Sequence, residues 1–274
     1  MVTLAAASWG TWSLFLRPTG LPATTTTPII FLVMAVVLLP FALRGARPPT
    51  RWDRATIGLL LANTMFDALN VVTFFAAIEH TTIAIAVLTH YLAPILVALA
   101  APRIDGTAVR GAVPAAAVAA LGLAIILQPW RAPGSGAATG AVLGVLSAFC
   151  YAGNVFSTRR IVERIGAARA MSYHCFLAAV VLAPLAIGDL DRVSGEDLAL
   201  LGAGGVTIGA LSGMAFAVGL ARIGAARAAV LTFAEPLVAV TMGALVWEEA
   251  LHPLAALGGA MVLGAGLHVT RKPR

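Results

Sequence analysis

Apolar stretches of about 20 residues follow one another along the whole chain, and the connections between them are mostly shorter than a dozen residues. A helix needs roughly 20 predominantly apolar residues to cross about 30 Å of hydrocarbon. Ten windows meet this condition: 2–17, 26–43, 55–78, 82–101, 109–128, 138–158, 170–188, 198–220, 226–247 and 252–269. The sequence therefore predicts an all-α integral membrane protein with ten transmembrane helices.

Composition points the same way. Of the 274 residues 60% are apolar and only 11% are charged, whereas a soluble domain carries about 25% charged residues. The net charge of +6 does not predict a nucleic-acid partner, because the basic residues form short clusters between apolar runs. Cys150 and Cys175 both lie in apolar stretches and predict no disulfide framework. We expect no cofactor, and the spacing of His174, His252 and His268 predicts no metal site.

Basic residues are distributed unequally between alternate connections. If the N-terminus is cytoplasmic, fifteen of the eighteen basic residues fall on the cytoplasmic side, as the positive-inside rule requires. Only Arg17, Arg131 and Arg192 fall outside. The outer side instead receives seven acids: Glu79, Asp189, Asp191, Glu196, Asp197, Glu248 and Glu249. Ten spans with both termini cytoplasmic are therefore expected.

The first window has no basic region before it and does not predict a signal peptide. It is also short, so we expect an oblique span or a start upstream of Met1.

The chain also repeats itself. Residues 74–88 align with 217–231 at an offset of 143, and VLTHYLAP (87–94) matches VLTFAEP (230–236), so that Pro94 and Pro236 become equivalent. Gly122 and Gly264 occupy equivalent places further on. Two five-helix repeats are predicted, over 1–130 and 137–270. Since five is odd, the second repeat must be inverted in the membrane, an arrangement typical of secondary transporters.

With Trp9-Gly10, Glu235-Pro236 and Glu248 in these places, the chain resembles the EamA-like branch of the drug/metabolite transporter superfamily over nearly its whole length. The resemblance implies ten helices in two repeats and a carrier of amino acids, drugs, nucleotide-linked sugars or other metabolites, often outward. It also implies that helices three, four, eight and nine line a central cavity. The first repeat departs from the family pattern, with Ala93 before Pro94 and only Asp105 as counterpart of the helix-ending glutamate.

Asp67 and Glu235 are the two acids that fall well inside predicted spans. Ionisable groups in the membrane cost about 2.5–3.5 kcal/mol on insertion scales and usually face a cavity or a partner. Asn63, Asp67 and Asn70 are spaced i, i+4, i+7 and share one helix face. This stripe is a substrate or proton site, or a hydrogen-bonded seam between helices; the sequence leaves both open.

His90 lies four residues before Pro94, which cannot donate a backbone hydrogen bond to the His90 carbonyl. A locally opened helix is expected there. His90 could form a proton relay with Asp67 or be a satisfied interior histidine, and Tyr91 could face the substrate or simply pack. Glu235, directly before Pro236, is a counter-charge for a cationic substrate, a protonation site, or a structural contact at the proline break.

Three further groups are candidates. Tyr151 and Asn154 share a helix face and are explained by ligand contact or by packing. Trp9 and Trp12 are cavity aromatics or interfacial anchors. The small-residue stripe of Gly205, Gly209 and Gly213 predicts close helix packing.

The function that these residues predict is a secondary transporter, an exporter of a small metabolite such as an amino acid or amine, working by alternating access at a midplane cavity. Proton coupling through Asp67, His90 or Glu235 and facilitated uniport fit equally well. A lipid or lipid-linked sugar flippase on the same fold is an alternative. An intramembrane enzyme is disfavoured, because no HExxH, GxSxG or paired catalytic aspartates occur in the spans. The expected partners are a small-molecule substrate and the lipid bilayer of the plasma or inner membrane; a homodimer is left open.

Overall fold

The computed structural model describes residues 1–44, 52–106, 109–131 and 136–271, and within these ranges all regular structure is helical. Arg47, Arg51, Lys272 and Arg274, which contribute to the predicted charge asymmetry, lie outside these ranges. The elements are α1 (Val2–Trp9), α2 (Ser13–Leu16), η1 (Arg17–Thr19), α3 (Ala23–Arg44), α4 (Arg54–His80), α5 (Ile83–His90), α6 (Ala93–Ile104), α7 (Ala112–Leu127), α8 (Ala137–Ile165), α9 (Ala167–Ala186), η2 (Ile187–Arg192), α10 (Gly195–Gly204), η3 (Gly205–Leu211), α11 (Ser212–Ile223), α12 (Ala225–Leu231), α13 (Ala234–Val246) and α14 (Ala255–Arg271).

Seven helical stretches within the described ranges are long and apolar enough to cross a membrane: Ala23–Arg44, Arg54–His80, Ile83–Ile104, Ala137–Ile165, Ala167–Arg192, Gly195–Ile223 and Ala225–Val246. Ala112–Leu127 is apolar but shorter. Large apolar side chains cover the outside of these helices, among them Val36, Leu121, Val142 and Leu263, each more than half exposed. A surface of this kind needs lipid around it, so the molecule is a multi-pass helical membrane protein.

Four of the predicted windows are interrupted in the structure. The 82–101 window divides where α5 ends at His90 and α6 begins at Ala93, and the 226–247 window divides between Leu231 and Ala234. In both cases a proline lies within two residues of the start of the second helix. Proline has no backbone N–H, so one carbonyl in the preceding turn lacks its helical hydrogen bond. The break expected near Pro94 is therefore present. The breaks in 2–17, after Trp9, and in 198–220, where η3 is a π-helix, were not expected.

Two helical hairpins turn on a single glycine. Gly166 separates α8 from α9 with φ +84° and ψ 156°, and Gly224 separates α11 from α12 with φ +81° and ψ 161°. Only glycine adopts this backbone conformation without strain. α8 runs to Ile165, seven residues beyond the predicted end at residue 158, because the helix continues through the polar stretch that contains Arg159, Arg160 and Arg164 until Gly166 ends it.

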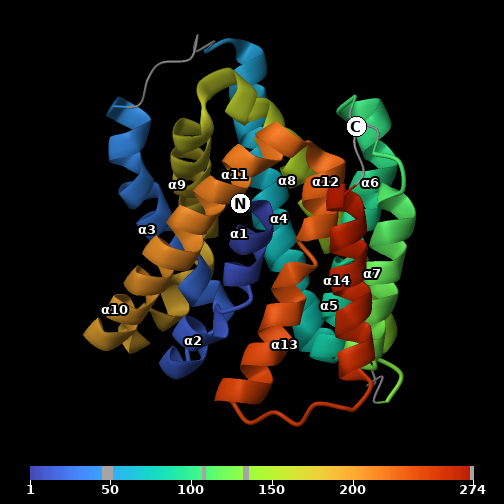
Figure 1. The fold of residues 1–274 in the computed structure, drawn as a ribbon. Helices are drawn as coiled ribbons and strands as arrows, with labels where there is room; N and C mark the ends of the chain where they lie inside the picture. The colour runs from blue at the N-terminus through green and yellow to red at the C-terminus, as the bar shows by residue number, and fades with distance from the viewer. Residues whose placement is uncertain (45–51, 107–108, 132–135, 272–274) are drawn as a thin grey trace.

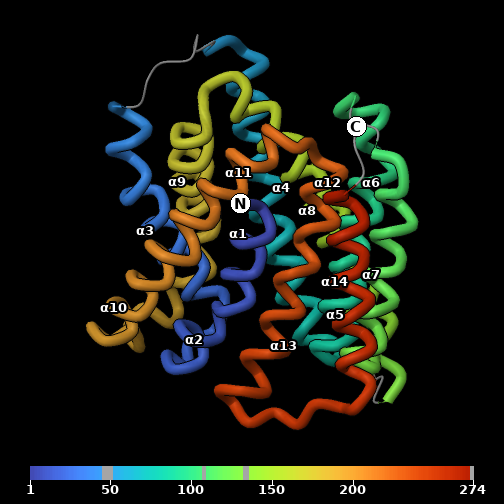
Figure 2. The backbone as a smooth tube through the Cα atoms, in the orientation of Figure 1, coloured from blue at the N-terminus to red at the C-terminus, as the bar shows by residue number. Residues whose placement is uncertain are grey.

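Helices far apart in sequence pack side by side (Figures 1 and 2). α4 packs along α8, α3 along α9, α7 along α14, and α6 against α12. The glycine stripe of η3 and α11 allows a close approach to α3, since a Cβ on Gly205 would lie 2.8 Å from a Val33 methyl and one on Gly209 would lie 2.7 Å from Met34 Cγ. These contacts leave a cavity in the middle of the bundle.

Candidate functional site

A cavity of about 440 Å³ lies between the helices. Seven of the nine predicted site residues line it, and Asn63 and Tyr91 do not. Those on the wall are Trp9, Asp67, Asn70, His90, Tyr151, Asn154 and Glu235. The sequence positions of these seven residues span 226 places from Trp9 to Glu235, so the fold has assembled one polar site from α1, α4, α5, α8 and α13.

Asp67 pairs with a residue that sequence reasoning did not select. His174 of α9 places Nε2 2.6 Å from Asp67 Oδ2, and the exposed fractions of the two side chains are 5% and 16%. Phe31 of α3 approaches the imidazole edge-on, with ring centroids 5.9 Å apart. Of the two alternatives left open for His90, the pairing with Asp67 is absent, because Asp67 bonds His174 and His90 bonds Ser147. In the sequence, only the polar stripe of α4 indicated that Asp67 has a partner. Nothing in the apolar run around His174 identifies His174 as that partner.

His90 belongs to a second network. Its Nδ1 lies 2.8 Å from Ser147 Oγ, and this hydroxyl donates to Asn70 Oδ1 over 2.7 Å. The ring also contacts Phe74 and Tyr151, with centroids 4.9 and 5.4 Å away. α4, α5 and α8 are thus joined at the cavity wall by polar and aromatic contacts together.

Glu235 lies in the first turn of α13, directly after the break. Tyr91 is buried, with its ring against those of His90 and Phe233, and it does not line the cavity. On the other side Gly10 approaches the same turn: a Cβ there would lie 2.7 Å from the Ala239 backbone nitrogen and would overlap the Glu235 carbonyl oxygen. The Trp9-Gly10 and Glu235-Pro236 pairs, 225 residues apart, therefore meet at one point.

Two asparagines have opposite environments. Asn63 is 2% exposed, and its Oδ1 accepts hydrogen bonds from Ser157 Oγ at 2.7 Å and Thr158 Oγ1 at 2.8 Å. It therefore forms a seam between α4 and α8. The Asn154 side chain lines the cavity, and its Nδ2 has no hydrogen-bond partner among the described residues. The nitrogen itself is buried, so this state of the cavity does not expose it to a ligand.

More helices line the cavity than the resemblance implied. Besides α4, α5, η3, α11 and α13, the wall includes α1, α3, α8 and α9. The Trp9 ring contacts that of Phe216 in a tilted arrangement, with centroids 4.9 Å apart, and Trp12 also lines the cavity. Two acids and several aromatic rings around one space can hold a small polar or cationic molecule.

Comparisons with known proteins agree with this architecture. Residues 138–270 match the EamA-like transporter family. An uncharacterized transporter of Archaeoglobus fulgidus is 28% identical over 275 residues, which cover 99% of this chain and 95% of that protein. A protein of known crystal structure superposes with a TM-score of 0.84 at 20% identity, over 98% of this chain and 96% of the other, and so shares the fold. The second half of the chain is thus similar to the EamA-like transporter family, and nearly the whole chain is similar to a transporter.

Proposed function

We propose that this membrane transporter exports a small metabolite carrying an amino group, such as an amino acid or an amine, across the plasma or inner membrane. The observation that carries the proposal is the placement of two carboxylates, Asp67 and Glu235, on the wall of one cavity together with Trp9, Phe74 and Tyr151. An ammonium group gains from both the negative charges and the aromatic faces.

The mechanism that we propose is alternating access between two inverted five-helix repeats, each contributing to a ten-helix bundle. The packing pairs support it. If the two repeats are equivalent, α4 corresponds to α11 and α8 corresponds to α1. The contact between α4 and α8 then predicts a contact between α11 and α1, and both contacts are present. The pairs α3–α9 and α7–α14 each map onto themselves under the same correspondence, as a two-fold relation requires.

Transport by purified protein in sealed liposomes tests the proposal. Labelled amines and amino acids should accumulate or exchange through the wild type and be recovered chemically unchanged. Glu235→Gln should reduce the rate at least about tenfold, because it removes one of two charges in the cavity. Glu196→Gln, which neutralises an exposed acid far from the cavity, is the matched control. Chemical conversion of the solute without uptake would instead identify an intramembrane enzyme.

Two modes of coupling follow from the same site. Counter-transport of protons would use Asp67 with His174, or Glu235; uniport would use neither. An imposed pH gradient distinguishes them, because only a proton-coupled carrier concentrates substrate in response to it.

A flippase is the second candidate, and one feature favours it. A smaller pocket of about 150 Å³ between α3, α4 and α9 shares Ala23, Thr27, Val71 and Phe75 with the central cavity and continues to the exposed Leu185. A lateral opening of this kind would admit a lipid tail. Scrambling of a labelled lipid by the liposomes, without uptake of soluble amines, would support the flippase.

A further inference from the structure

Among the ion pairs that join the two halves of the chain, two lie at opposite ends of the molecule. Arg159, near the end of α8, pairs with Asp105, the residue that ends α6. Arg17, the first residue of η1, pairs with Glu249, with Nη2 and Oε1 2.5 Å apart. The ends of α2 and α13, which lead into the second pair, lie at the bottom of Figure 1, and the α11–α12 junction beside the first pair lies at the top.

The two pairs occupy related places in the repeats. Arg17 precedes Arg160, the neighbour of Arg159, by 143 residues, which is the repeat offset. Asp105 follows Pro94 by eleven residues, and Glu249 follows Pro236 by thirteen. In the alignment of the two repeats, each residue of one pair therefore lies within two positions of a residue of the other pair.

Their burial is unequal. In the first pair Asp105 is 2% and Arg159 17% exposed, and Asp105 also accepts a hydrogen bond of 3.2 Å from the backbone nitrogen of Ala225, where α12 begins. In the second pair the side chains of Glu249 and Arg17 are 50% and 48% exposed. Exposed pairs contribute little to stability, whereas removing one partner of a buried pair leaves an uncompensated charge. A buried ion pair therefore stabilises the contact between the halves at the Asp105–Arg159 end of the molecule, whereas the pair at the Arg17–Glu249 end is solvent-exposed.

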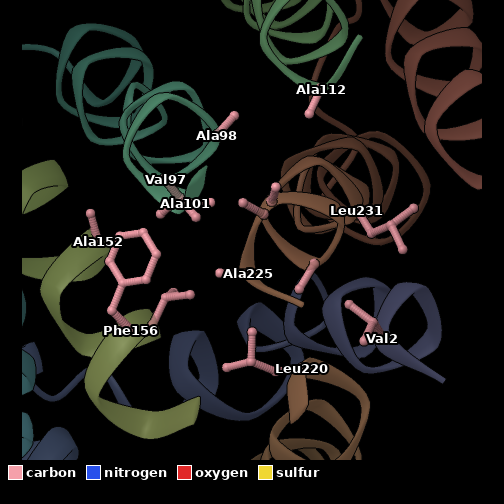
Figure 3. Close-up of a cluster of buried hydrophobic side chains, with 14 of the residues drawn as sticks. Val2, Val97, Ala98, Ala101, Ala112, Ala152, Phe156, Leu220, Ala225 and Leu231 are labelled. Atoms are coloured by element: carbon pink, nitrogen blue, oxygen red, sulfur yellow. The ribbon is translucent and has the colours of Figure 1, made fainter. Parts of the chain in front are cut away.

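Apolar packing shows the same asymmetry, whereas the cavity lining reaches toward both pairs. Val97, Ala101, Phe156, Leu220 and neighbouring side chains from α6, α8 and α11 form a buried cluster beside the first pair (Figure 3). The cavity lining on α8 ends at Thr158, directly before Arg159. Toward the other end the lining reaches Leu16, directly before Arg17, and Ala23 at the start of α3.

We propose that Asp105–Arg159 and Arg17–Glu249 are alternating latches, one at each entrance to the cavity. This inference rests on the proposed alternating-access function. In the state described here the Asp105–Arg159 latch is buried and closes its end. When it is released, the Arg17–Glu249 latch becomes buried and closes the opposite end. Each latch stabilises only the state in which it is desolvated, so each substitution biases the equilibrium in a predictable direction.

A cysteine reporter in the cavity tests the latches without any substrate. Met171→Cys, which lines the cavity, is placed in a background in which the buried Cys150 and Cys175 are replaced by alanine. Labelling with a membrane-impermeant maleimide is compared between right-side-out and inside-out vesicles. Asp105→Asn should shift the ratio of labelling rates about tenfold toward the Asp105 end, and Glu249→Gln should shift it in the opposite direction.

Three measurements complete the design. Arg192→Gln breaks an ion pair within the second half, to Asp189 at 2.8 Å, and should leave the ratio unchanged. The charge exchange Asp105→Arg with Arg159→Asp should restore the wild-type ratio. Arg17→Gln should shift the ratio as Glu249→Gln does, without loss of folded protein, because the Arg17 side chain is half exposed. An unchanged ratio in Glu249→Gln and Arg17→Gln, or a shift of all variants in one direction, would refute the latches alone. A reporter labelled from one side only in every variant would also refute alternating access.

Discussion

At the scale of single residues, the polar stripe of α4 divides between two roles. Asn63 is enclosed by Ser157 and Thr158, whereas Asp67, one turn later, lines the cavity and bonds His174. Spacing places the two side chains on one face but cannot tell a seam from a site. That difference depends on which helix faces each turn, and only the packed bundle shows it.

Substitution of the two residues should separate these roles. Asp67→Asn should abolish transport with little loss of thermal stability, since the amide can still bond the imidazole but carries no charge. Asn63→Ala should lower the free energy of unfolding by about 0.6–1.7 kcal/mol, the range measured for interhelical hydrogen bonds in membranes, and leave the KM for transport unchanged. Thermal unfolding in detergent and uptake by liposomes measure both effects. Loss of folded protein in Asp67→Asn would instead assign Asp67 to the structural seam.

At the scale of helices, the breaks decide where the site lies. Pro94 and Pro236 predict interruptions from the sequence, because each removes a backbone donor. The interruption after Trp9 has another cause, visible only in the fold: the turn at Gly10 presses against the first turn of α13. No local rule connects residues 225 places apart.

Gly10→Ala should therefore destabilise the protein by about 1–3 kcal/mol, the usual cost of overpacking, and displace Glu235. We expect a lower unfolding temperature and slower transport. Gly58→Ala is the matched control: Gly58 lies inside α4, and a Cβ there would meet nothing within 4 Å. It should be neutral or stabilising by about 0.5–1 kcal/mol, the difference between glycine and alanine in a helix. Equal effects of the two substitutions would contradict the close contact between α1 and α13.

At the scale of the whole molecule, hydropathy and charge predict ten spans with both termini cytoplasmic, and labelling of exposed sites can check this topology. In a background without Cys150 and Cys175, Gly188→Cys in η2 should react with an impermeant maleimide in intact cells. Glu163→Cys near the end of α8 should react only after permeabilisation. Both positions are exposed, so access to the reagent differs only through the membrane. Labelling of Glu163→Cys in intact cells would contradict the predicted orientation.

The sequence by itself determined that this chain is a helical membrane protein, because each apolar run carries its own local signal of length and composition. Seven of the nine predicted site residues line the cavity, and that they bind a substrate stays a prediction. Tertiary structure alone decided that Asp67 bonds His174 and not His90, that Asn63 is enclosed, and that Asp105 is buried against Arg159 while Glu249 is half exposed. These are properties of pairs distant in sequence, and their energies depend on how completely the bundle excludes water around each pair.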